Sequence, residues 1–76
     1  MKKMTCKQLG GACDHIFEAN SFNEMIRLSK KHGSKMFLKG DQAHIEAMEE
    51  VQELIQSPEA MQEWIEEKRR LFEALT

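Results

Sequence analysis

Hydrophobic residues recur at helical spacing over most of the chain after residue 20. The first such stretch begins with "SFNE", in which Ser21 and Glu24 form a capping box that satisfies free backbone N–H groups at a helix start. Its apolar face consists of Phe22, Met25, Ile26, Met36 and Phe37. Because this face continues past Gly33, we predict one helix over residues 22–39, ended by Gly40.

Two further helices are predicted in the C-terminal half of the chain. Asp41 is a good N-cap, and the apolar face after it consists of Ile45, Met48, Val51, Leu54 and Ile55. Ser57 and Pro58 begin the next helix, because proline suits the first helical position. Its apolar face consists of Met61, Trp64, Ile65, Lys68, Phe72 and Leu75. The short connection between the two predicts an antiparallel helical hairpin over residues 41–76.

The first 19 residues have the pattern of a β-hairpin. Residues 2–6 and 14–19 are predicted to be extended, with a loop around Gly10 and Gly11 between them. A two-stranded hairpin is marginal unless another element covers it, so we expect the first helix to pack on it. The prediction is an α+β fold and a single small domain over residues 1–76, in which the helical hairpin extends a unit formed by residues 1–40.

Composition narrows the classes of function. The chain has 76 residues, of which 41% are hydrophobic and 32% charged, a balance typical of a soluble globular domain. Its net charge of −2 leaves no basic excess for phosphates, so no nucleic-acid partner is expected. Neither a signal peptide nor a membrane-spanning apolar run is recognisable, which predicts a cytoplasmic protein without a membrane partner. Thiols are kept reduced in that compartment, which disfavours a disulfide.

The two cysteines flank the glycine loop, with six residues between them. The residues able to bind a soft metal are Cys6, Cys13, His15, His32 and His44. Zinc favours four thiolate or imidazole ligands in a tetrahedron, and Cys6 with Cys13 across the hairpin mouth can join His32 and His44 from the helices. The cysteine spacing differs from the usual two to four intervening residues. The simpler alternative is that both cysteines are buried core residues.

Two other functions have some support in the sequence. A thiol enzyme would use Cys13 as the nucleophile with His15 on the same side, but no helix begins directly after Cys13 to lower its pKa. We therefore expect no enzyme activity. The six methionines and Trp64 favour a homo-oligomer or protein partner bound through the C-terminal helices, and this interaction module, with core cysteines and no metal, is the competing hypothesis.

The stretch "MTCKQLGGACD" followed by "SFNEM" resembles a family of short, mostly bacterial proteins of unknown function labelled "predicted small metal-binding protein". The shared features are a Cys-x-x-Leu-Gly turn and a Cys-Asp pair before a helix, which fall on Cys6, Leu9, Gly10, Cys13 and Asp14. The resemblance covers roughly the first half of the chain. Family members have two histidines about five residues apart at the end of the helix. This chain has only His32 there, so the resemblance implies that His44 supplies the fourth ligand.

Overall fold

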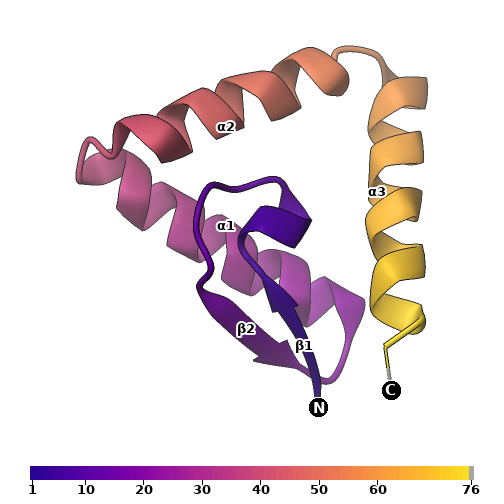
Figure 1. Ribbon diagram of the computed structural model, residues 1–76. Coiled ribbons are helices and arrows are strands. Elements are labelled where there is room, and N and C mark those ends of the chain that lie inside the picture. The colour runs from indigo at the N-terminus through magenta and orange to yellow at the C-terminus, as the bar shows by residue number, and fades with distance from the viewer. Residues whose placement is uncertain (76) are drawn as a thin grey trace.

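The computed structural model describes residues 1–75 and has an α+β fold, as predicted (Figure 1). Two strands, β1 (Lys2–Thr5) and β2 (Ile16–Ala19), are joined by a loop that contains a short 3-10 helix, η1 (Lys7–Leu9). Three α-helices follow, and they are α1 (Phe22–Leu38), α2 (Gln42–Leu54) and α3 (Pro58–Glu73). Within residues 1–75, no helix combines the length and the apolar character needed to cross a membrane.

The two strands form an antiparallel hairpin in which Thr5 pairs with Ile16 and Met4 with Phe17. Alternation along the strands buries Met4 and Phe17 and leaves Lys3 and Glu18 on the outer face, where their charged groups lie 3.5 Å apart. Both strands are shorter than predicted. Backbone hydrogen bonds between the two segments continue beyond the ends of the strands. The extended conformation nevertheless ends at Thr5, because the chain enters the η1 turn directly after it.

All three helices begin at the predicted capping residues. Ser21 accepts a hydrogen bond from the Glu24 backbone N–H, and Ser57 accepts one from Ala60. Asp41 caps α2 in the same way. Helix α1 runs through Gly33 without a break and ends one residue before the predicted end. Gly40 then takes a φ of 75°, a left-handed conformation that glycine adopts without steric cost.

The hydrophobic core lies between the hairpin and the helices that cover it. Its buried members are Met4, Cys6, Leu9, Phe17, Ala19, Phe22, Met25 and Phe72. Seven of these come from the first 25 residues, and Phe72 of α3 is the remaining one. The Phe72 ring meets Phe22 edge to face, with ring centroids 5.9 Å apart. The end of α3 is therefore attached to the N-terminal unit, which makes the chain one packed body.

Helices α2 and α3 form a helical hairpin that is open rather than closely paired. In Figure 1 they diverge from the turn, and α3 runs back towards the hairpin, so that α1, α2 and α3 frame a triangle. Lys2 at the start of β1 donates a bond to the Glu73 carbonyl at 3.3 Å. Leu54 and Met61, predicted on apolar helix faces, are 61% and 46% exposed, because the helices diverge and do not cover each other's apolar faces.

Candidate metal centre

The hairpin places Cys6 and Cys13 opposite each other. The Cys6 N–H donates to the His15 carbonyl at 2.9 Å, and the Lys7 N–H donates to the Cys13 carbonyl at 3.1 Å. These bonds continue the pairing of β1 and β2 beyond the ends of the strands. The two cysteines are free thiols that come from the two sides of one loop. The glycine loop therefore brings them together, as predicted.

Glycine is required at position 11 because the loop passes closely over a cysteine. The Gly11 N–H donates to the Cys6 carbonyl at 2.8 Å, and a Cβ atom at position 11 would overlap the Cys6 sulfur. Gly10 beside it has a φ of 92°, again in the left-handed region. The two glycines thus have different tasks, since Gly10 allows the turn and Gly11 leaves room for the thiol.

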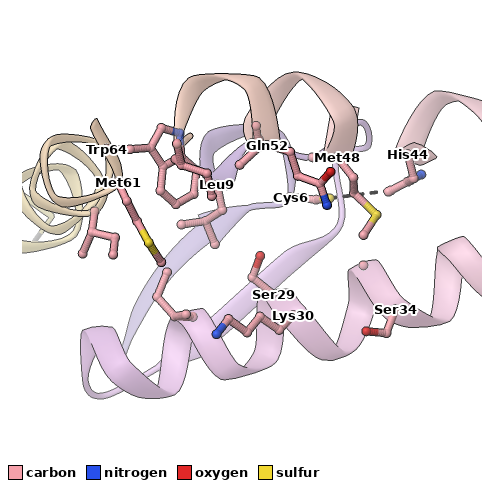
Figure 2. Close-up of a pocket in the computed structure, with 17 residues that line it drawn as sticks. Cys6, Leu9, Ser29, Lys30, Ser34, His44, Met48, Gln52, Met61 and Trp64 are labelled. Carbon is pink, nitrogen blue, oxygen red and sulfur yellow. Dashed lines mark hydrogen bonds between the residues drawn. The ribbon is translucent and has the colours of Figure 1, made fainter. Parts of the chain in front are cut away.

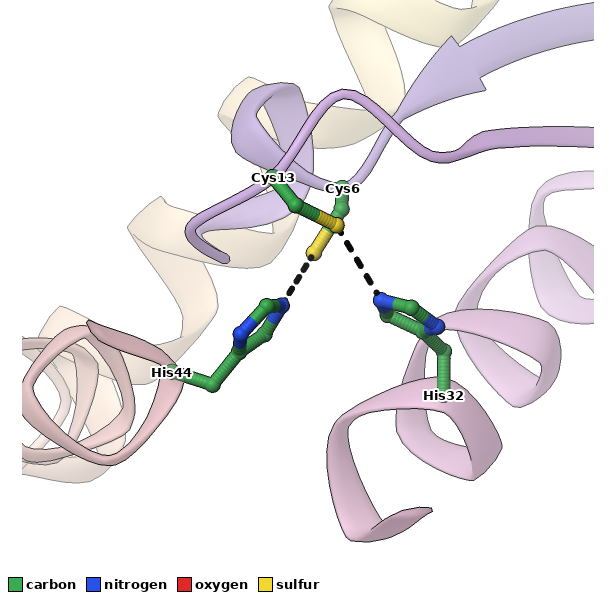
Figure 3. Close-up of side chains that lie close together, drawn as sticks. All are labelled: Cys6, Cys13, His32 and His44. Atoms are coloured by element: carbon green, nitrogen blue, oxygen red, sulfur yellow. Dashed lines mark hydrogen bonds between the residues drawn. The ribbon is translucent and has the colours of Figure 1, made fainter. Parts of the chain in front are cut away.

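The two histidines reach the cysteines from different helices (Figure 3). His32 lies in the second half of α1, and its Nε2 atom is 3.3 Å from the Cys13 sulfur. His44 is the third residue of α2 and is 3% exposed, with its Nε2 atom 3.6 Å from the Cys6 sulfur. The left-handed Gly40 between α1 and α2 turns the chain so that both imidazoles face the same loop.

Asp41 orients the His44 ring. Its Oδ1 atom accepts the His44 backbone N–H at 3.0 Å and lies 2.9 Å from the ring Nδ1 atom. A carboxylate accepts hydrogen bonds, so Nδ1 carries the proton and Nε2 presents its lone pair to the cysteines. A carboxylate behind a histidine in this way is the common second layer of metal sites, where it fixes the tautomer and the ring orientation.

The four side chains have the dimensions of a slightly expanded tetrahedral site. The ligand atoms of Cys6, Cys13, His32 and His44 all lie within 4.8 Å of one another. Zinc bonds of about 2.3 Å to sulfur and about 2.0 Å to nitrogen separate neighbouring ligand atoms by roughly 3.3–3.8 Å. Two sulfur–nitrogen distances, 3.3 Å for Cys13 with His32 and 3.6 Å for Cys6 with His44, already fall in that range. These four residues can therefore hold a metal ion after small side-chain movements.

The two thiols differ in acidity. Burial raises the pKa of the Cys6 thiol, and bonds from the Cys13 and Ala12 backbone offset this only in part. Burial also opposes ionisation of Cys13. There, however, hydrogen bonds involving the His15 backbone and the His44 and Cys6 side chains outweigh it and lower the pKa. Cys13 is thus the more readily ionised thiol, and thiolate is the form that binds metal.

The pKa values of the two imidazoles are shifted in opposite directions. The hydrogen bond to Asp41 raises the pKa of His44, and the same bond lowers the pKa of Asp41. Burial, together with electrostatic repulsion from nearby basic side chains, lowers the pKa of His32. The lowered pKa favours the neutral form of His32, which coordinates a metal, whereas the raised pKa of His44 makes protons compete more strongly with a metal at Nε2.

His15, which the sequence also marked as a metal-binding candidate, lies outside the group of four. It is exposed and stacks on His32, with ring centroids 4.6 Å apart and planes 11° from parallel. Phe17 contacts both rings edge to face, at 5.0 and 5.4 Å. Together these rings restrict the orientation of His32. His15 therefore packs against the candidate ligand His32 and is not itself one of the four candidate ligands.

Sequence reasoning missed two contributors to this site. Asp41 was assigned only as a helix cap, although its spacing of three residues from His44 on a helix start places the two side chains on one side. Gly11 was assigned only to the turn, and nothing in its sequence context signals the approach of the Cys6 sulfur. The first could have been found from spacing, and the second required the coordinates.

Comparisons of the chain with protein-family models, with curated proteins and with solved structures find no match. The arguments about function below therefore rest on the residues and geometry of this chain.

Proposed function

We propose that this protein is a non-enzymatic zinc-binding protein in which Cys6, Cys13, His32 and His44 hold a structural metal ion. The observation that carries the proposal is the convergence of these four ligand atoms to within 4.8 Å. They come from the hairpin loop, from α1 and from the start of α2, which are distant in sequence. Four soft or borderline donors meeting at one point, with no acidic residue among them, have the composition of a Cys2His2 zinc site.

A structural role for the metal follows from the number of protein ligands. Structural zinc sites use four protein ligands, whereas catalytic sites leave one position for water or substrate. A stabilising metal ion suits the size of the protein, because a chain of 76 residues buries little apolar surface for its length. Zinc would join three elements that otherwise share a small core, and its binding energy would add directly to folding.

The motifs around Cys6 and Cys13 support membership of the family of small metal-binding proteins that the chain resembles. Within the proposal, His44 supplies the ligand that family members take from the end of the first helix. The buried position of His44 and its bond to Asp41 favour this substitution, because an exposed histidine without a partner would lack the required orientation. A reducing, cytoplasmic compartment is consistent with two free thiols.

Native mass spectrometry and thermal unfolding of the same samples test the proposal. Chain stripped with a chelator and then supplied with zinc is expected to bind one ion. With zinc at about a hundred times its dissociation constant, stability should rise by about 2.7 kcal/mol. Cys6→Ser, Cys13→Ser and His44→Gln should each reduce or abolish the zinc-bound mass. His15→Gln is the matched control and should retain it, because His15 lies outside the group of four.

The result that would overturn the proposal is an equal mass with and without zinc, together with unchanged thermal stability. The cysteines would then be core residues only, in line with the burial of Cys6 in the hydrophobic core. Cobalt as a substitute ion gives a second readout, since its absorption distinguishes tetrahedral sulfur and nitrogen coordination from binding by surface carboxylates. Binding without the tetrahedral spectrum would contradict the ligand assignment.

A further inference from the structure

The triangle of helices encloses a mostly apolar cavity that reaches the metal centre at one side, where Cys6 and His44 border it. Its volume is about 460 Å³. Figure 2 shows it between α1 and α2, with α3 at one end and the N-terminal segment behind it. The apolar side chains that border it include Ile26, Met48, Val51, Met61, Trp64 and Ile65. None of these six is buried. They form one continuous hydrophobic surface that is only partly covered.

The chain exposes more surface than a monomer of its size should. A compact monomer of this mass is expected to expose about 4,800 Å², whereas this 8.9 kDa chain exposes 5424 Å². The excess of roughly 600 Å² approaches the ~800 Å² that each partner buries in a stable protein interface. The molecule is also flat, with extents of 34 × 27 × 15 Å. A flat frame of helices lacks the second layer that normally covers apolar helix faces.

We propose that a second copy of this chain covers the cavity and forms a two-fold symmetric dimer in which α1 of each copy lies over α2 of the other. Charge favours this partner and this arrangement. Helix α1 carries Arg27, Lys30, Lys31 and Lys35 against the single acid Glu24. Helix α2 carries Glu46, Glu49, Glu50 and Glu53 and has neither lysine nor arginine. Each copy therefore offers the other one basic and one acidic helix beside the same apolar surface.

Two-fold symmetry fits the positions of these helices. In Figure 1, α1 and α2 are two sides of the triangle that meet at the turn around Gly40. An axis that runs parallel to the plane of the triangle, outside the molecule and over the cavity, in the direction from this corner to α3, exchanges the places of α1 and α2. In the dimer generated by that axis, the basic helix α1 of each copy lies over the acidic helix α2 of the other. The α3 helices, which carry Trp64, then lie against each other. An axis that stacks α1 on α1 would oppose like charges.

Lys30 and Glu49 are the charged residues best placed for this contact. Lys30 borders the cavity on α1, and Glu49 lies one turn from Gln52, which borders it on α2. Exchanging the two charges tests the contact directly, because a residue that only stabilised its own helix would show no recovery in the double variant. Lys30→Glu or Glu49→Lys alone opposes like charges across the interface at two places, whereas the double variant restores opposite charges. These variants leave all four candidate metal ligands unchanged, although Cys6 and His44 also border the cavity, so zinc is kept at the same concentration in every sample.

Sedimentation velocity of the full chain at low and high micromolar concentration measures the association. We expect twice the chain mass at high concentration, with a shift of the fluorescence of Trp64, the single tryptophan, on dilution. Each single variant should raise the dissociation constant about tenfold, and the double variant should recover most of the loss. Lys35→Glu and Glu50→Lys are matched controls that make the same charge changes at residues outside the cavity lining, and each should raise the constant less than Lys30→Glu or Glu49→Lys.

A strict monomer at every concentration overturns the proposal, as does native mass spectrometry that finds a small apolar molecule retained by a monomer. A dimer that both single variants weaken but the double variant does not restore also overturns it, because the α1–α2 contact is then absent. Circular dichroism of each variant separates lost association from lost folding. Recovery in the double variant, which carries both substitutions, supports the proposal even if one single variant folds poorly.

Discussion

Asp41 accepts two hydrogen bonds from His44, one from the backbone N–H at 3.0 Å and one from ring Nδ1 at 2.9 Å. One carboxylate therefore begins α2 and orients an imidazole that faces Cys6. The start of the helix and the geometry of the candidate metal centre depend on the same side chain.

Replacing Asp41 by asparagine separates these two tasks. Asparagine caps a helix about as well as aspartate, so α2 should remain folded. An amide orients the imidazole less strongly than a carboxylate and leaves it less basic, so zinc affinity should fall by about 10- to 100-fold. Competition with a chromophoric chelator measures the affinity, and circular dichroism checks the helix. An unchanged affinity would show that the Asp41–His44 bond has no influence on the metal.

Alanine at position 11 should damage the site through the thiol. The added Cβ atom would overlap the Cys6 sulfur, so the loop must move, at a cost of about 1–3 kcal/mol typical of overpacking. Gly33→Ala is the matched control. Gly33 is helical, a Cβ atom there has no neighbour within 4 Å, and alanine should stabilise α1 by about 0.5–1 kcal/mol. Urea unfolding with and without zinc measures both, and equal stability of the two variants would contradict the close approach.

The two cysteines should react at different rates in metal-free protein. Cys13 is half-buried with a lowered pKa, whereas Cys6 is 4% exposed with a pKa raised by burial. Iodoacetamide should therefore label Cys13 first, and zinc should protect both, since alkylation requires free thiolate. Peptide mapping at timed intervals measures the order. In denaturant the preference should vanish, and faster labelling of Cys6 in the folded chain would be inconsistent with the structure.

The stability of the metal-free chain should pass through a maximum near pH 6.5, the ordinary pKa of histidine. His44 has a raised pKa, so its contribution is complete below about pH 6.5 and is lost as the pH rises through the folded value. His32 has a lowered pKa, so stability also falls as the pH drops from about 6.5 through its folded value.

Urea unfolding between about pH 5 and 7.5, in the presence of a chelator, measures this profile. His44→Gln should remove the decline on the alkaline side, and His32→Gln should remove the decline on the acid side. A flat profile for the parent chain, or a minimum near pH 6.5, would contradict the two opposite shifts.

Local signals in the sequence predicted the elements well. Capping residues bond to the backbone within one turn, so the starts of all three helices could be recognised at Ser21, Asp41 and Ser57. The ends of the strands were less accurate. They depend on where the η1 turn begins, and this is set by backbone bonds between Cys6 and residues of its own loop.

Burial in the C-terminal half was predicted less well. Helical periodicity places Leu54 and Met61 on apolar faces, but whether such a face is covered depends on the angle between helices. That angle is decided by distant contacts such as Phe72 with Phe22. Trp64 and Met61 of α3 border the cavity between the helices.

The sequence by itself determined the elements, their caps and the chemical types able to bind a soft metal, because these depend on residue identity and on spacing within a few turns. Only the tertiary structure decided that Cys6, Cys13, His32 and His44 meet, while His15 stacks beside them. Their meeting requires the Gly40 turn to aim two helices at one loop. It also requires Gly11 to make room for a sulfur. Both are relations between segments far apart along the chain, which no local pattern records.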